Sequence, residues 1–94
     1  MMLRKGYLMA YLVQISEENL KVVILAVTTH NPPFVKIFDN LEEARTAVFG
    51  ITGAHLPELT PITKDVFWSN IKDLKKSDER LAPINFGSVL KRLV

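Results

Sequence analysis

The sequence LKVVILAVTT at residues 20–29 decides the fold. It is rich in valine, isoleucine and threonine, whose branched side chains favour a β-strand. Successive side chains of a strand point to opposite faces, and here both faces are largely apolar. A strand of this kind is expected either at the centre of a sheet with cover on both faces or under a partner molecule.

Shorter segments on either side of this stretch show the alternation of half-buried strands. Residues 9–16 alternate, with Tyr11 and Val13 on one face. A polar break of hairpin length follows at residues 17–19, and a loop with two prolines precedes a third alternating segment at residues 34–38. Three strands with short links predict an antiparallel meander.

The periodicity of the chain then becomes helical. Asp39 or Asn40 can cap a helix that starts at residue 41, and Gly50 or Gly53 can end it. The side chains expected to face the core follow the spacing of one helix face: Leu41, Ala44, Val48 and Ile51.

A second helix is expected to start between Thr60 and Thr63, with Thr60 before Pro61 as a cap-then-first-turn pair, and to end before residues 77–80. The tail at residues 84–94 has two interpretations. It is a short helix capped by Ser88, or it contains a fourth strand, and we favour the helix.

Together these elements predict an α+β fold, with a three-stranded antiparallel meander followed by two helices and a short C-terminal helix or strand. The chain has 94 residues and no cysteine. Two separate cores of half that size would need disulfides or metals, so residues 1–94 are expected to form a single domain. We expect the first strand to start at Met9, with residues 1–8 as a disordered lead-in.

Hydrophobic residues make up 48% of this short chain. A small domain has much surface for its volume, so some of these residues are expected to cover a partner protein or a second copy in a homodimer. The residues that we expect at such an interface come from the apolar strand, the segment after the proline loop and the second helix: Val23, Leu25, Val27, Phe34 and Trp68.

Basic residues gather in the last third of the chain. Residues 64–94 contain seven lysines or arginines and four acidic residues. A nucleic acid could bind such a region through its phosphates, with contacts from Lys72, Lys75, Lys76 and Arg80. Because acidic residues interrupt the same stretch, we favour a solvated helix face over a nucleic-acid site.

Catalysis is not expected. The chain lacks cysteine, its serines lie outside nucleophile motifs, and its two histidines, His30 and His55, lie in different loops. Neither a metal-ligand pattern nor a glycine-rich phosphate loop is present, so no metal and no cofactor are expected. No apolar run approaches the roughly 20 residues of a membrane helix, and we expect a cytoplasmic protein.

These observations favour a non-enzymatic, self-associating protein-binding module. Small inhibitors or antagonists of other proteins, such as those made by phages and mobile elements, fit this description. The alternative is a weak nucleic-acid-binding domain that uses the basic region at residues 64–94.

Overall fold

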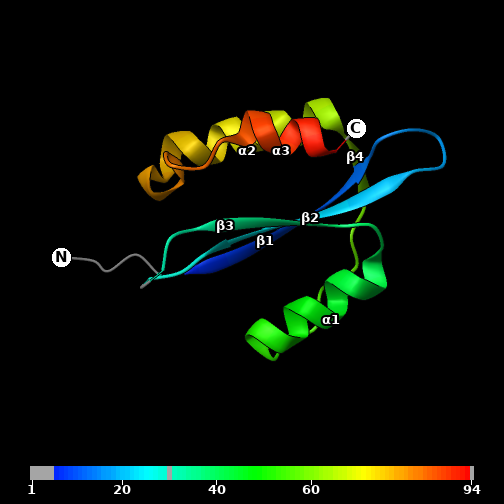
Figure 1. Ribbon diagram of the computed structural model, residues 1–94, viewed down its shortest axis with the longest axis horizontal. Coiled ribbons are helices and arrows are strands. Elements are labelled where there is room, and N and C mark those ends of the chain that lie inside the picture. The colour runs from blue at the N-terminus through cyan, green and yellow to red at the C-terminus, as the bar shows by residue number, and fades with distance from the viewer. Residues whose placement is uncertain (1–5, 30, 94) are drawn as a thin grey trace.

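A mixed four-stranded sheet lies between helices in the computed structural model, which describes residues 6–29 and 31–93 (Figure 1). The strand order is β3-β2-β1-β4. Helix α1 lies on one side of the sheet, and helices α2 and α3 lie on the other. In chain order the elements are β1 (Tyr7–Gln14), β2 (Leu20–Val27), β3 (Phe34–Phe38), α1 (Leu41–Thr52), β4 (Pro61–Thr63), α2 (Lys64–Ser77), the short 3-10 helix η1 (Glu79–Leu81) and α3 (Phe86–Arg92).

The predicted antiparallel meander is confirmed. Strand β2 pairs antiparallel with β1 on one side and with β3 on the other, so the apolar strand lies at the centre of these three. Strand β1 starts at Tyr7, two residues earlier than expected. Tyr7 and Leu8 of the expected lead-in are therefore part of the sheet, and residues 1–5 lie outside the described residues.

The short strand β4 was not predicted. Its three residues pair in parallel with residues 12–14 of β1, in a segment that the sequence indicates to be a proline-rich loop. Pro61 is tolerated there because it is the first residue of a strand at the edge of the sheet. Three residues are too few to show an alternating pattern, and so the pairing leaves no signal in the sequence.

Side-chain caps set where the helices begin. Asn40 caps α1 by accepting a hydrogen bond from the backbone N–H of Glu43 at 2.8 Å, and Gly53 ends it with a left-handed φ of 72°. The cap of α2 is Thr63, not Thr60, because residues 61–63 are occupied by β4. Its hydroxyl oxygen accepts from the N–H of Val66 at 3.1 Å.

The tail forms the favoured short helix, α3. Its cap is Asn85, whose Oδ1 accepts a hydrogen bond from the backbone N–H of Ser88 at 3.2 Å. Ser88 is therefore the residue that is capped, not the cap. A fourth strand does exist in the protein, but it is β4 and not the tail.

The sheet separates two clusters of buried side chains. The larger one lies under α2 and α3, and the smaller one lies under α1. Odd-numbered residues of β1 and β2 point to the first, and even-numbered residues point to the second. The buried members of the larger cluster are Tyr11, Val13, Val23, Leu25, Val27, Phe67, Ile71, Leu81, Phe86, Val89 and Leu93. Those of the smaller cluster are Leu12, Val22, Ile24, Ala44, Val48 and Leu56.

The expectation that Val23, Leu25 and Val27 lie at a partner interface is wrong. All three side chains are buried in the larger cluster, with at most 2% of their surface exposed. The physical reason is the crossover through β4, which returns the chain to the uncovered face of the sheet and places α2 and α3 on it. The chain's own helices therefore cover the apolar strand on both faces.

Candidate interaction surface

The two predicted aromatic contacts, Phe34 and Trp68, lie on opposite sides of the sheet. Phe34 pairs with Ala26 at the start of β3, which places it on the face of α1. Trp68 is half-buried against the larger cluster on α2, and the ammonium of Lys72 lies 5.9 Å from the centre of its ring. The two aromatic side chains therefore do not form one surface.

The predicted basic residues also fail to form one free surface. Lys72 and Lys76 are exposed. Lys75 is half-buried, with its ammonium 5.6 Å from the centre of the Phe86 ring. Arg80 is held by an ion pair with Asp78 at 2.7 Å. With the contact of Lys72 on the Trp68 ring, three of the four side chains make contacts within the chain.

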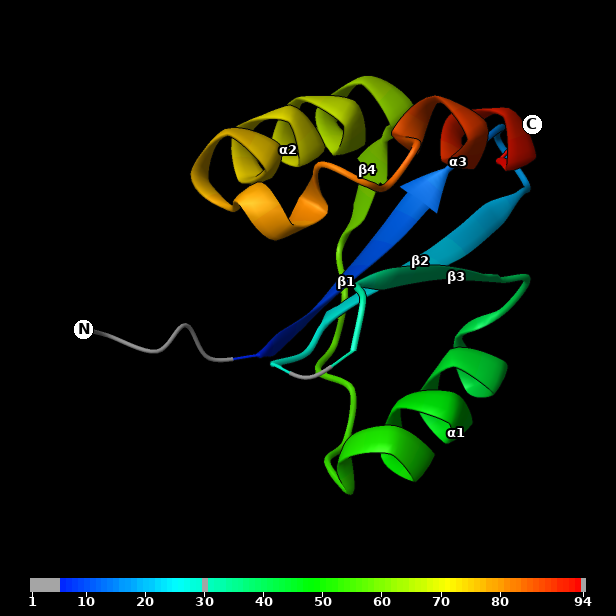
Figure 2. The same ribbon diagram turned by 60° about the vertical axis from the view of Figure 1, so that its left-hand side comes forward.

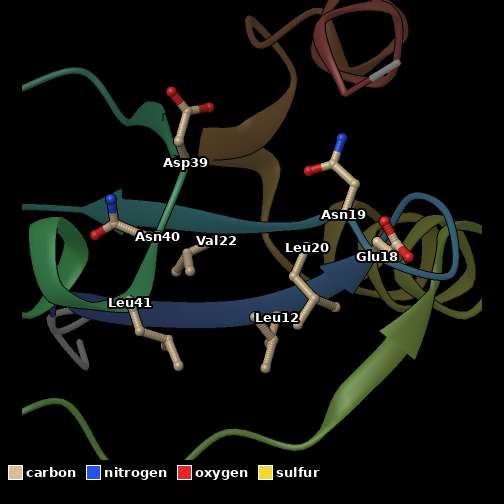
Figure 3. Close-up of a pocket in the computed structure, with 8 residues that line it drawn as sticks. All are labelled: Leu12, Glu18, Asn19, Leu20, Val22, Asp39, Asn40 and Leu41. Carbon is tan, nitrogen blue, oxygen red and sulfur yellow. The ribbon is translucent and has the colours of Figure 1, made fainter.

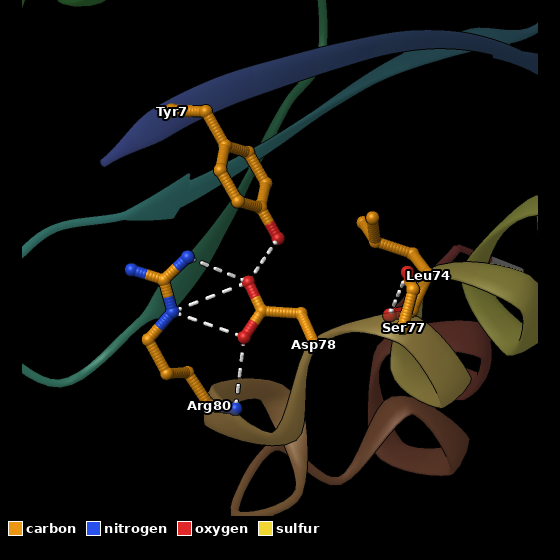
Figure 4. Close-up of polar contacts among 5 residues, drawn as sticks. All are labelled: Tyr7, Leu74, Ser77, Asp78 and Arg80. Carbon is orange, nitrogen blue, oxygen red and sulfur yellow. Dashed lines mark hydrogen bonds and ion pairs between the residues drawn. The ribbon is translucent and has the colours of Figure 1, made fainter. Parts of the chain in front are cut away.

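The Asp78 carboxylate connects the start of β1 with the segment that follows α2 (Figure 4). It is only 5% exposed, and it accepts a hydrogen bond from the Tyr7 hydroxyl at 2.8 Å across 71 positions in the sequence. The guanidinium of Arg80 donates to both carboxylate oxygens, at 2.9 Å from Nε to Oδ1 and 2.7 Å from Nη2 to Oδ2. The contact fastens the segment after α2 to the start of β1.

These contacts shift the pKa values of the Asp78 carboxyl group and the Tyr7 hydroxyl group. The hydrogen bonds from Arg80 hold the pKa of Asp78 well below its ordinary value of 3.8, although burial alone would raise it. Burial, followed by the hydrogen bond to Asp78, raises the pKa of Tyr7 to about 12. At neutral pH the pair is therefore a carboxylate with a neutral phenol.

Helix α1 leaves large apolar side chains exposed at its C-terminal end. Phe49 is 51% exposed and Ile51 is 54% exposed. Ile51 has the helix position expected for a core residue, but it lines an open hollow between the end of α1 and the sheet and stays exposed. The imidazole of His55 stacks on Phe49 with ring centres 5.3 Å apart. We call Phe49, Gly50 and Ile51 the α1 end patch.

Hollows open at both ends of the layer between α1 and the sheet. At the end near the β1–β2 hairpin, a hollow of about 280 Å³ has an apolar floor and a polar rim (Figure 3). Leu12, Leu20, Val22 and Leu41 line the floor, and Glu18, Asn19, Asp39 and Asn40 form the rim. At the other end, a hollow of about 330 Å³ is lined by both the sheet and the last residues of α1, including Leu8, Ala26 and Ile51. A single helix therefore covers this face incompletely.

No candidate metal site is found in the part of the chain that the structure describes. Within residues 6–29 and 31–93, no group of three or more histidine, aspartate or glutamate side chains could hold a metal ion. His55 is exposed and its ring contacts Phe49, whereas His30 lies outside the described residues. None of the described helices is both long and apolar enough to span a bilayer.

Comparisons of the chain with models of protein families, with curated proteins and with solved structures found no match. The α1 end patch was missed by sequence reasoning, which expects Ile51 in the core and treats Gly50 as a helix end. One feature of the sequence indicated this exposed apolar surface. The segment VFGIT at residues 48–52 carries no charged residue, which is unusual for the exposed last turn of a helix.

Proposed function

We propose that the protein is a non-enzymatic protein-binding module that self-associates through the α1 end patch. The observation that carries this proposal is the exposure of Phe49 and Ile51, two large apolar side chains separated by one residue, at the end of a helix. The two side chains lie roughly 100° to either side of Gly50 around the helix axis, so they flank this glycine and do not form one row. Large exposed apolar side chains are typical of protein interfaces. Residues 48–52 carry no charge, and the exposed Arg45 lies one helical turn before Phe49, so a second copy would meet a charge only at the edge of the patch.

Gly50 supports contact with another molecule at this place. A Cβ atom at Gly50 would meet nothing within 4 Å, so packing inside the chain does not require a glycine. Glycine inside a helix costs roughly 0.5–1 kcal/mol relative to alanine. Contact with a second helix would explain why a glycine is present despite this cost, because the absence of a side chain lets two helix backbones come together.

The test is the oligomeric state of the protein across a range of concentrations, measured by size-exclusion chromatography with light scattering. We expect a concentration-dependent dimer that the double variant Phe49→Ser and Ile51→Ser converts to a monomer. Val66→Ser is the matched control, because Val66 is a 45% exposed apolar residue on α2, away from the patch. A monomer at all concentrations, or equal weakening by the control, would overturn the proposal.

Gly50→Ala separates association from folding. Its methyl group enters open space, so the isolated chain should become more stable by roughly 0.5–1 kcal/mol while the dimer weakens. Urea unfolding at low concentration measures the first effect, and light scattering measures the second. If the variant associates as strongly as the original protein, close helix contact at Gly50 is excluded.

Nucleic-acid binding is the second candidate function. Its support is the excess of seven basic over four acidic residues in residues 64–94. Titration with DNA and RNA at low and moderate salt tests it, because binding through phosphates weakens steeply as salt rises. Lack of cysteine is compatible with a reducing compartment, and we place either interaction in the cytoplasm.

A further inference from the structure

Part of β1 has no neighbouring strand on the side away from β2, and we call the space beside this part the open row. Strand β1 has eight residues, but β4 pairs with only three of them, at positions 12–14. Within the described residues, positions 7–11 pair with β2 on one side and with no strand on the other. In the described structure, the backbone N–H and C=O groups that point away from β2 in this segment bond neither to a strand nor to the backbone of a turn or loop.

The two edges of the sheet differ in how they are protected. The outer edge, β3, has the exposed Lys36 at the centre of its sequence FVKIF, and a charge at that position discourages pairing with other strands. The open part of β1 has the sequence YLMAY, with no charge and no proline. Its central residue, Met9, is 37% exposed. This edge therefore lacks the usual protection.

A hollow of about 420 Å³ adjoins the open row on the side of α2. Its apolar lining comes from Met9, Tyr11 and Leu74, and its polar lining comes from Asn70, Asp73 and Ser77 on one flank of α2. Asp73 is exposed and makes no ion pair with any described residue. The hollow thus offers room for side chains of a strand in the row, together with a negative charge.

We infer that the row binds an extended segment of a partner protein, which adds to β1 as a strand and carries a basic side chain toward Asp73. Backbone hydrogen bonds would provide the attachment, and alternate side chains would enter the hollow, as in other cases of strand addition. This inference concerns a surface separate from the α1 end patch and does not depend on the proposed function.

A second copy pairing through its own β1 fits this row poorly. Helix α2 follows β1 along its length, since Phe67 contacts Tyr11 with ring centres 5.2 Å apart and Asp78 binds Tyr7 just beyond the helix (Figure 2). Paired strands lie about 4.8 Å apart, whereas packed helices need roughly 8–10 Å. Two α2 helices would compete for the same space, so a segment without its own covering helix is the better occupant.

The probe is the capped peptide acetyl-Thr-Thr-Val-Lys-Val-Thr-Thr-amide, titrated into the full chain and followed by NMR. Amide protons in residues 7–11 that point away from β2 should shift and exchange with solvent about tenfold more slowly when the peptide is bound. The amides of β3 are the internal control and should not change. Shifts confined to β3, or no slowing in residues 7–11, would overturn the inference.

Matched changes separate backbone pairing from contact between charges. A peptide with an N-methyl group on every residue loses the backbone donors of both edges and should bind about tenfold more weakly. Exchanging the peptide lysine for glutamate should weaken binding to the original protein, and Asp73→Lys should reverse that preference. Met9→Lys, which gives β1 the protection that β3 has, should abolish binding while the fold is retained. Equal binding of the N-methylated peptide would exclude strand addition.

Discussion

The two faces of the sheet receive apolar side chains from the same strands but are covered unequally. The face under α2 and α3 contains two fully buried phenylalanines, Phe67 and Phe86. The face under α1 has only Ala44 and Val48 as buried helix residues. Small side chains bring less apolar surface to the core, so α1 contributes less burial and its last turn stays exposed. The stability of the fold is therefore expected to depend mainly on the larger cluster.

Phe67→Ala is the change with the largest expected effect. Phe67 is fully buried between α2 and the sheet and contacts Tyr11 edge to face. Its truncation should lower the free energy of unfolding by about 4 kcal/mol, through lost burial and the cavity left behind. Urea unfolding measures this loss. A loss below about 1 kcal/mol would show that the larger cluster does not dominate the stability.

Val22 and Val23 offer a matched comparison of the two faces. They are neighbours on β2, each 1% exposed, and they point to opposite clusters. We expect Val23→Ala to lower the free energy of unfolding by about 2 kcal/mol and Val22→Ala by about 1 kcal/mol, because α1 can move toward the sheet to close the space. If the two variants lose the same free energy of unfolding in urea, α1 does not move to close the space, and both faces are equally rigid.

The Asp78 contact makes the larger face sensitive to pH. Because the folded-state pKa of Asp78 lies below 3.8, its stabilisation is complete at neutral pH and is lost as the pH falls through the folded-state pKa. Asp78→Asn should therefore cost about 1–2 kcal/mol at pH 7 and progressively less in acid. Unfolding midpoints measured at several pH values test this, and a cost that does not change with pH would contradict it.

Tyr7 is expected to make the free energy of unfolding depend on pH in the alkaline range. Its pKa is raised from 10 to about 12, so its contribution is present below pH 10 and is lost as the pH rises toward 12. Tyr7→Phe should remove that alkaline loss and leave the acid dependence in place. If the variant and the original protein lose stability in parallel above pH 10, Tyr7 is not the titrating group.

Sequence reasoning succeeded where a pattern is local and repeated. The alternation in β2 and the helical spacing of Leu41, Ala44 and Val48 each report the face of an element that is buried, and the structure confirms both. The prediction was wrong for Ile51, which has the spacing of a core residue but is exposed because no neighbouring element covers it. Periodicity indicates which side of an element is apolar, and it does not indicate how far the neighbouring element reaches.

Local interactions within a few residues determined the strands β1, β2 and β3 and the presence of the helices, because alternation and helical spacing act over that range. Contacts between distant segments decided the rest. The parallel pairing of β4 with β1 placed α2 and α3 over one face of the apolar strand, buried Val23, Leu25 and Val27, and left part of β1 without a neighbour. Such a pairing joins segments about fifty residues apart through backbone hydrogen bonds, which carry no side-chain signature.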